Sequence, residues 1–178
     1  MAQRILGLDL GAHEVKAVLL ESAFRGFAVA GTGRAPVAAG EAPLAERQGA
    51  ATRELLAAAG FAFDAAVVAF PGAGGSSVVV TLPFTDPRRI EQTVGFEVEG
   101  QIPFDLADVA WDWQPLGTRD GKTDLLVAVV RQEELAAVVA ALAGAGVDPR
   151  AVLPAAPTYA ALFAGGAVAP AAGDPQGV

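Results

Sequence analysis

The order of strands and helices predicts a layered α/β domain into which a second, smaller unit is inserted. Three observations support this prediction. Apolar runs at the N-terminus indicate three sequential antiparallel strands, a segment with helical periodicity follows them, and a further set of strands and helices precedes the last predicted strand. A chain of 178 residues can bury such a core without disulfides, and this chain contains no cysteine.

The main domain begins with a hairpin whose two apolar strands flank Gly11. A third strand follows from Gly26, and the helix after it has an apolar stripe that Gly60 can end. A short apolar run then returns as a buried strand. The predicted elements are strands at residues 5–10, 15–20 and about 26–34, a helix marked by Leu44, Gln48, Ala51, Leu55 and Ala59, and a strand at residues 65–70.

The inserted unit has strands and helices of its own. Asp86 and Pro87 supply the cap and first turn of a helix that should stop near Pro103, and Asp120 with Gly121 predicts a tight turn between two strands. Its predicted elements are a strand at residues 76–82, a helix through Ile90, Val94 and Val98, strands at residues 109–113 and 125–130, and a helix through Leu135, Val138, Val139 and Leu142 ended by Gly146. After the inserted unit, a strand at residues 151–153 and a helix at residues 159–163 return to the main domain.

Composition argues against several classes of function. Twenty acidic and twelve basic side chains give a formal net charge of -8, which repels nucleic acid and anionic membrane surfaces. The mean hydropathy of +0.43 raises the question of a membrane span, but Pro154, Pro157 and Pro170 interrupt the uncharged stretch at residues 151–173. The N-terminus has no pattern of a secretory signal, so we expect a cytoplasmic protein without a direct membrane span.

The first predicted hairpin carries the most informative motif, the run DLGAHEVK from Asp9 to Lys16. A carboxylate at a strand end can hold the water shell of Mg²⁺, and a glycine lets backbone N–H groups approach a phosphate. The same pattern is common as plain turn chemistry, so the motif alone leaves both interpretations open. A glycine-rich stretch at residues 72–77 looks like a phosphate loop, but the strand predicted after it favours a simple turn.

Several segments together resemble the PilM and GspL branch of the actin superfamily. The hairpin motif is similar to the family's first phosphate hairpin, and the most specific match is the block IPFD at residues 102–105, which follows an acidic helix end. The segments that carry the resemblance are residues 9–16, 82–83, 97–105, 109–113, 125–129 and 145–147, so it covers nearly the whole chain to about Phe163.

The resemblance implies an actin-like (ribonuclease H-like) domain I, in which subdomain IA carries an inserted subdomain of the IC type. It also implies half of a two-domain protein, because family members place a second phosphate hairpin and the adenosine pocket in a later domain. The implied boundaries are residues 1–73 for the first part of IA, 74–146 for the IC-like insertion, 147–164 for the completion of IA and 165–178 for a linker.

The function that the resemblance implies is a scaffold of a type II secretion or type IV pilus assembly machine, at the cytoplasmic face of the inner membrane, and not an enzyme. Its expected partners are the cytoplasmic tail of an inner-membrane protein of the PilN or GspM kind and the assembly ATPase. Trp111 and Trp113, on one strand face, and the acidic Glu97 and Glu99 are candidates for the partner surface. The alternative is that the tryptophans are buried against helices and the glutamates form a solvated helix face.

The nucleotide site that the family implies would use Asp9, Gly11, Ala12 and Lys16, with Asp9 holding Mg²⁺ through water. The chain departs from the family at the hairpin tip, where the sequence Ala-His-Glu at residues 12–14 replaces small hydroxyl residues. Fewer hydroxyl donors and an added carboxylate weaken phosphate binding. We therefore expect a degenerate site, with no cofactor in this chain and ATP with Mg²⁺ only in the full-length parent.

Two enzyme functions are the alternatives. Half of an actin-fold ATPase or sugar kinase would use the same hairpin for Mg-ATP, but the sequence shows no sugar-binding constellation or catalytic aspartate. A ribonuclease H-like nuclease needs further carboxylates beside Asp9, and no acid follows the strand at residues 65–70. His13 is the only histidine and lies at a predicted loop tip, which argues against a nucleophilic triad.

Overall fold

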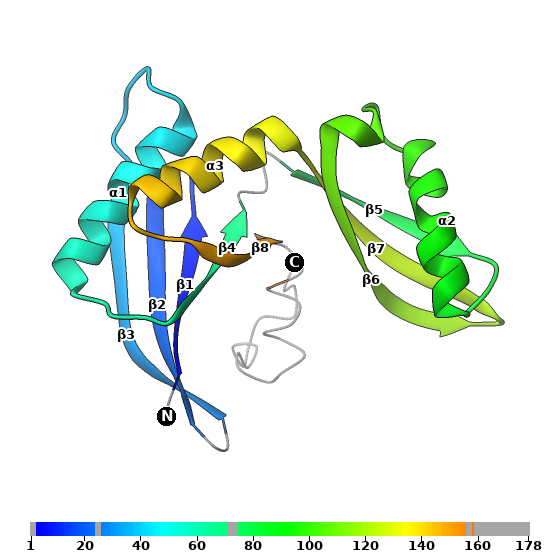
Figure 1. The fold of residues 1–178 in the computed structure, drawn as a ribbon, viewed down its shortest axis with the longest axis horizontal. Coiled ribbons are helices and arrows are strands. Elements are labelled where there is room, and N and C mark those ends of the chain that lie inside the picture. The colour runs from blue at the N-terminus through cyan, green and yellow to red at the C-terminus, as the bar shows by residue number, and fades with distance from the viewer. Residues whose placement is uncertain (1–2, 24–25, 71–74, 156–157, 159–178) are drawn as a thin grey trace, which may run out of the picture.

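The computed structural model describes residues 3–23, 26–70, 75–155 and 158. Its strands form two sheets that lie side by side, with helix α3 reaching from one to the other (Figure 1). The five-stranded subdomain consists of β1 (Arg4–Leu10), β2 (Glu14–Ala23), β3 (Gly26–Pro36), α1 (Leu44–Ala59), β4 (Ala65–Phe70), α3 (Gln132–Gly144) and β8 (Pro149–Pro154). The three-stranded subdomain consists of β5 (Gly75–Leu82), α2 (Pro87–Glu99), the short 3-10 helix η1 (Leu106–Asp108), β6 (Val109–Arg119) and β7 (Lys122–Arg131).

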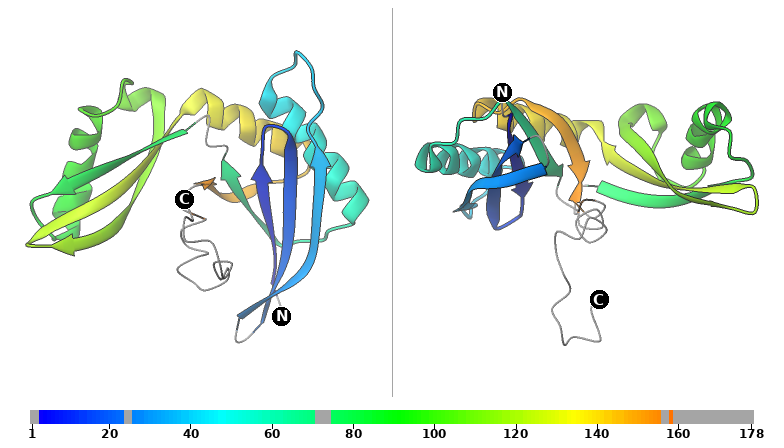
Figure 2. Two further views of the ribbon diagram at one scale, coloured as in Figure 1. Left: turned by 180° about the vertical axis from the view of Figure 1, so that it is seen from behind. Right: turned by 90° about the horizontal axis from the view of Figure 1, so that it is seen from below.

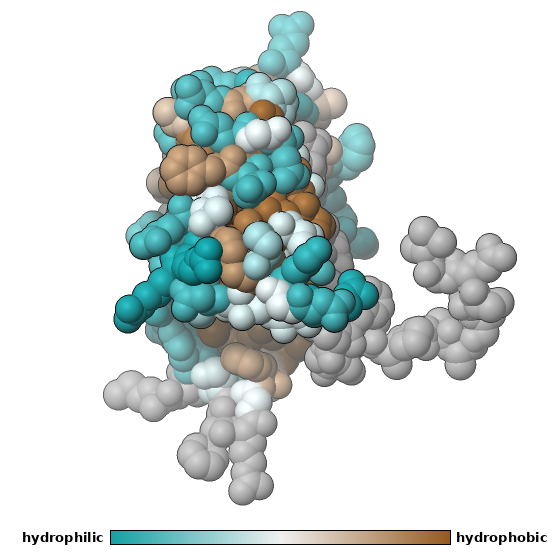
Figure 3. Space-filling view, turned by 90° about the vertical axis from the view of Figure 1, so that its right-hand side faces the viewer, coloured by the Kyte–Doolittle hydropathy of each residue, from teal (hydrophilic) through white to brown (hydrophobic). Residues whose placement is uncertain are grey.

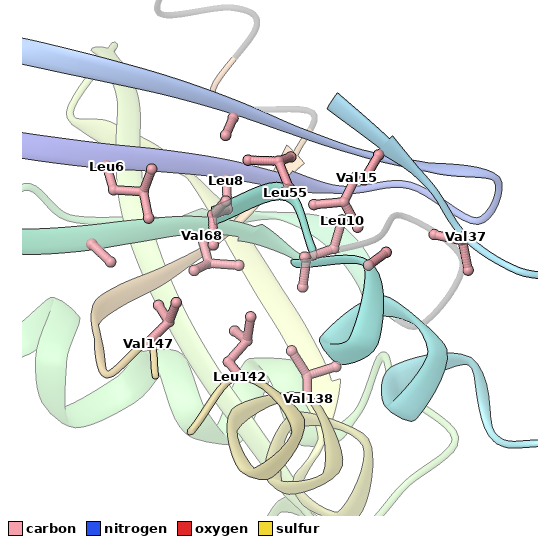
Figure 4. Packing of buried hydrophobic residues seen from close by; sticks show 14 of the residues in the cluster. Leu6, Leu8, Leu10, Val15, Val37, Leu55, Val68, Val138, Leu142 and Val147 are labelled. Atoms are coloured by element: carbon pink, nitrogen blue, oxygen red, sulfur yellow. The ribbon is translucent and has the colours of Figure 1, made fainter. Parts of the chain in front are cut away.

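The five-stranded sheet has the order β3-β2-β1-β4-β8; β3, β2 and β1 pair antiparallel, and β1, β4 and β8 pair parallel. Side chains alternate along β1, so Leu6, Leu8 and Leu10 point to one face of the sheet. They meet Val68 of β4 and Leu142 of α3 in a single apolar core (Figure 4). Because α1 and α3 both contribute to this core, the two helices cover the same face of the sheet (Figure 2).

Helices α1 and α3 approach each other closely at a glycine. A Cβ atom on Gly49 of α1 would lie only 2.7 Å from the carbonyl oxygen of Ala141 in α3. Any larger residue there would push the two helices apart. Gly60 ends α1 in the left-handed conformation at φ 62°, as its position after the apolar stripe predicts.

The three-stranded sheet has the order β5-β7-β6 and is covered on one face by α2. Asp86 caps α2 by accepting a hydrogen bond from the Arg89 N–H at 2.9 Å, with Pro87 in the first turn. Asp120 and Gly121 both have positive φ and form the predicted turn between β6 and β7. The buried core between sheet and helix consists of Val80, Leu82, Ile90, Val94, Val98, Val109, Leu125, Val127 and Val129.

The position of α3 differs from the sequence-based expectation. The predicted insertion extends to residue 146 and includes this helix, whereas Val138 and Leu142 of α3 lie in the core of the five-stranded subdomain. The apolar stripe predicts a helix, but it contains no information on which sheet the helix covers. The helix predicted at residues 159–163 and the linker at residues 165–178 lie outside the described residues. Within the described ranges, no helix is long and apolar enough to cross a membrane.

Candidate functional site

The hairpin between β1 and β2 pairs each of its carboxylates with a basic residue. Asp9 lies opposite Lys16, and the Lys16 Nζ is 3.8 Å from the Asp9 Oδ2. The Nε of Arg34, on β3, is 3.7 Å from the Glu14 Oε1. All four side chains are partly exposed, so each pair contributes about 1 kcal/mol or less to stability. The pairing reduces the uncompensated negative charge at the hairpin.

Gly11 makes the tight turn of this hairpin possible. Its N–H donates a hydrogen bond to the Glu14 carbonyl oxygen at 3.1 Å, and a Cβ atom on Gly11 would lie 2.5 Å from the same oxygen. Ala12 and His13 are exposed at the tip, where the His13 carbonyl oxygen accepts a hydrogen bond from the Val37 N–H at 2.8 Å. The Gly11 amide, which the predicted nucleotide site would use, is therefore engaged within the turn.

Gln48 of α1 holds this hairpin from within the core, a role that was not apparent from the sequence. Its side chain is only 2% exposed, and its Nε2 donates hydrogen bonds to the carbonyl oxygens of Leu10 at 3.1 Å and Gly11 at 3.0 Å. A buried amide must find partners of this kind, because an unpaired one would weaken the fold. The signal in the sequence is a glutamine on the apolar stripe of a predicted helix.

The hairpin by itself supplies only one side of a nucleotide site. Asp9 retains a carboxylate at a strand end, as Mg²⁺ binding through water requires, but Lys16 is already its neighbour. Among the described residues, no group of three or more side chains is arranged to ligate a metal. The nucleotide role of Asp9, Gly11, Ala12 and Lys16 stays a prediction.

A groove between the two subdomains is the second candidate site. Two neighbouring cavities, of about 240 and 220 Å³, lie between β8 and the three-stranded sheet. They share Asp112 of β6, Ala128 of β7, and Leu153 and Pro154 of β8. We call the surface lined by both cavities the inter-subdomain groove. Its remaining lining is mostly apolar and comes from β4, β5, β6, β7, α3 and the segment after β8.

Alternation along the strands explains which side chains form the floor of this groove. Trp111 and Trp113 pack into the core beneath α2, so Asp112 between them points to the opposite face of the sheet. In the strand register Asp112 lies beside Ala128, and Ala128 lies beside Ser77. The small side chains of this row leave a hollow next to the carboxylate.

The structure brings the two predicted tryptophans to the groove but not the two predicted glutamates. Trp111 lines one cavity and Trp113 lines the other, while both also pack beneath α2. Glu97 and Glu99 are exposed on α2, which covers the other face of the sheet. Seen from the end formed by the three-stranded subdomain, the surface mixes hydrophilic and apolar residues (Figure 3). The partner-binding role of all four residues stays a prediction.

Contacts at the junction of β7 and α3 join the two walls of the groove. Gln132, the first residue of α3, donates Nε2 hydrogen bonds to the carbonyl oxygens of Ala107 at 3.1 Å and Val109 at 3.3 Å. Arg131 binds Glu134 in the first turn of α3, and this hydrogen bond raises the pKa of Arg131 above its ordinary value. The direction in which α3 leaves the three-stranded sheet is thereby held by side chains.

Two of the solved structures that are similar to the chain come from pilus and secretion systems. One is a PilM-PilN type IV pilus biogenesis complex, with a TM-score of 0.75 and 28% identity over 89% of this chain and 49% of that chain. The other is the cytoplasmic domain of EpsL, an inner membrane component of the type II secretion system of Vibrio cholerae, with a TM-score of 0.57 and 22% identity over 85% of this chain and 57% of that chain. The five-stranded sheet carries an inserted subdomain, and the chain is similar to these two structures. Together these findings identify an actin-like domain, as predicted.

The family follows from the sequence match. The model of the family described as type IV pilus assembly protein PilM matches residues 7–164. The chain therefore belongs to the PilM family, which the block at residues 102–105 and the hairpin motif predicted. A search of curated proteins found no match. The chain spans 49% and 57% of the lengths of the two similar structures, which is about half.

Proposed function

We propose that the chain is the partner-binding half of an assembly scaffold, and that the inter-subdomain groove binds the extended cytoplasmic tail of an inner-membrane protein of the PilN or GspM kind. The groove is the observation that carries this proposal. A peptide that binds in extended form needs an accessible strand edge and apolar hollows for alternate side chains. Strand β6 lies at the edge of its sheet, and both cavities lie beside it.

The comparisons support the choice of partner. The chain belongs to the PilM family, and one similar structure is described as a PilM-PilN complex. In this proposal the protein works at the cytoplasmic face of the inner membrane, in a type IV pilus or type II secretion machine, and also contacts the assembly ATPase. Glu97 and Glu99 are exposed on the face of the three-stranded subdomain away from the groove, so they remain available to a second partner.

The proposal treats the nucleotide site as degenerate and the chain as a binding module without its own enzyme activity. Three features of the hairpin support this view. The Gly11 N–H is engaged by Glu14, Lys16 lies beside Asp9, and the exposed tip residues have no hydroxyl groups. Binding of ATP with Mg²⁺ is assigned to the full-length parent, whose later domain would supply the other side of the site.

Fluorescence anisotropy tests the proposed function. The probe is the labelled N-terminal cytoplasmic peptide of the neighbouring membrane assembly protein, with a scrambled peptide as control. We expect saturable binding at micromolar concentration, unchanged by Mg-ATP. Leu153→Asp places a negative charge in the groove wall. Peptide binding would remove water from this carboxylate and cover it with apolar side chains, so the variant should weaken binding by about tenfold or more.

A matched variant controls for general effects of an added charge. Leu116 is 54% exposed, compared with 42% for Leu153, and lies outside both cavities. Leu116→Asp should bind the peptide as the unchanged protein does. Equal binding by Leu153→Asp and the unchanged protein would contradict the assignment of the groove, and absence of saturable binding by the unchanged protein would contradict the proposed function.

A further inference from the structure

Among the described residues that line the groove, Asp112 is the only one with an ionisable side chain. The other lining residues are apolar, small or neutral polar. Because both cavities share Asp112, its carboxylate lies where the two hollows meet. A segment that occupies the whole groove must pass over this charge.

The carboxylate has no cationic neighbour within the described part of the chain. Its Oδ1 accepts a hydrogen bond from the Trp113 N–H at 2.8 Å, and none of the ion pairs found there includes Asp112. Residues 151–178 of the sequence include no lysine or arginine.

Covering an unpaired carboxylate is unfavourable. An apolar peptide laid across the groove would take water away from Asp112 and leave its negative charge without a partner. An acidic peptide would add repulsion to this loss. A lysine or arginine at the matching place replaces the lost water with a charge-assisted hydrogen bond. The small neighbours of Asp112, Ala128 and Ser77, leave room for such a side chain.

We infer that the occupant of the groove carries a lysine or arginine that pairs with Asp112, and that Asp112 is a specificity-determining residue for an extended, apolar segment with one basic side chain. This inference rests on the proposed function and adds the chemistry of the partner to it. The pair selects against neutral and acidic segments of the same shape, since each would leave the carboxylate unpaired. The net charge of -8 also favours the approach of a basic segment.

A double-mutant cycle tests the pair directly. The protein variant is Asp112→Asn, which keeps an oxygen to accept from the Trp113 N–H. The peptide variants replace each lysine or arginine of the membrane-protein peptide by methionine, one at a time. We expect Asp112→Asn to weaken binding of the unchanged peptide by about three- to tenfold. We also expect that one of the methionine-substituted peptides binds the unchanged protein and the Asp112→Asn variant with the same reduced affinity.

Salt dependence gives a second readout that a structural role of Asp112 would not move. Binding to the unchanged protein should weaken between about 50 and 300 mM NaCl, and binding to Asp112→Asn should weaken less over the same range. Asp124→Asn is the matched control. Asp124 is an aspartate of the neighbouring strand β7 that lies outside both cavities, and its Oδ1 accepts a hydrogen bond from the Thr81 hydroxyl at 2.6 Å.

The outcomes separate this inference from the proposed function. Saturable binding with equal affinity and equal salt dependence for the unchanged protein and Asp112→Asn would overturn the inference and leave the proposed function intact. An equal effect of Asp124→Asn would also overturn it, because the effect would then be general electrostatics. No binding by the unchanged protein would overturn both.

Discussion

Replacing Gln48 by methionine removes two buried hydrogen bonds. The replacement has a similar side-chain length and a similarly high helix propensity. The Gln48 Nε2 donates to the carbonyl oxygens of Leu10 at 3.1 Å and Gly11 at 3.0 Å, and the side chain is 2% exposed. Methionine would fill the same space but leave both carbonyl oxygens without this donor. The variant therefore measures the anchoring of the hairpin to α1.

The expected loss of stability follows from these two bonds. Each intramolecular hydrogen bond contributes about 0.5–1.5 kcal/mol net, so the two together amount to about 2 kcal/mol. In a chain of this size, 1 kcal/mol shifts the Tm by about 2–4 °C, so Gln48→Met should lower it by roughly 4–8 °C. Gln92→Met, on the exposed face of α2, is the matched control and should change stability by less than about 0.5 kcal/mol.

Urea unfolding followed by far-UV circular dichroism measures the difference in free energy of unfolding. A loss below about 0.5 kcal/mol for Gln48→Met, at an unchanged m-value, would refute the reasoning. Gln48→Glu adds a pH test. A buried glutamate beside two carbonyl oxygens is favoured in its protonated form, which raises its folded-state pKa. Gln48→Glu should therefore be more stable at acid pH and lose stability relative to the unchanged protein as pH rises.

Three further predictions concern the helix contact, the junction and the groove. Gly49→Ala should lower the free energy of unfolding by about 1–3 kcal/mol, because the new Cβ atom would lie 2.7 Å from the Ala141 carbonyl oxygen. This loss outweighs the better helix propensity of alanine. The control in the same urea assay is Gly117→Ala, whose Cβ atom would have no neighbour within 4 Å. Gln132→Met should broaden the distance distribution between spin labels placed on α1 and α2, because α3 loses its bonds to η1 at 3.1 Å and to the start of β6 at 3.3 Å; an unchanged distribution would contradict this role. The chain has no cysteine, which makes the labelling specific. Trp111 and Trp113 belong to β6, which borders the groove, and their side chains pack beneath α2, so a peptide laid along β6 should change this packing and shift the intrinsic fluorescence; an unchanged spectrum on binding would show that the peptide does not perturb β6.

The sequence by itself determined the local elements and the family. Apolar runs predicted most of the strands, Asp86 with Pro87 predicted the start of α2, and Asp120 with Gly121 predicted a tight turn. These signals act between residues close in the chain, so they can be recognised without the fold. The PilM family was predicted in the same way, because short motifs such as that at residues 102–105 are contiguous in sequence, and the match over residues 7–164 confirmed it.

Only the tertiary structure decided what depends on distant segments meeting. The stripe of α3 predicted a helix, but packing placed it on α1 and the five-stranded sheet. Gln48 appeared as one position of an apolar stripe until the hairpin, 37 and 38 residues earlier in the chain, was found at its amide. The groove is built from β4, β5, β6, β7, α3 and β8. The proposed role of Asp112 depends on the neutral side chains that these elements place around its carboxylate. Such contacts arise from the packing of surfaces, which no local pattern of residues specifies.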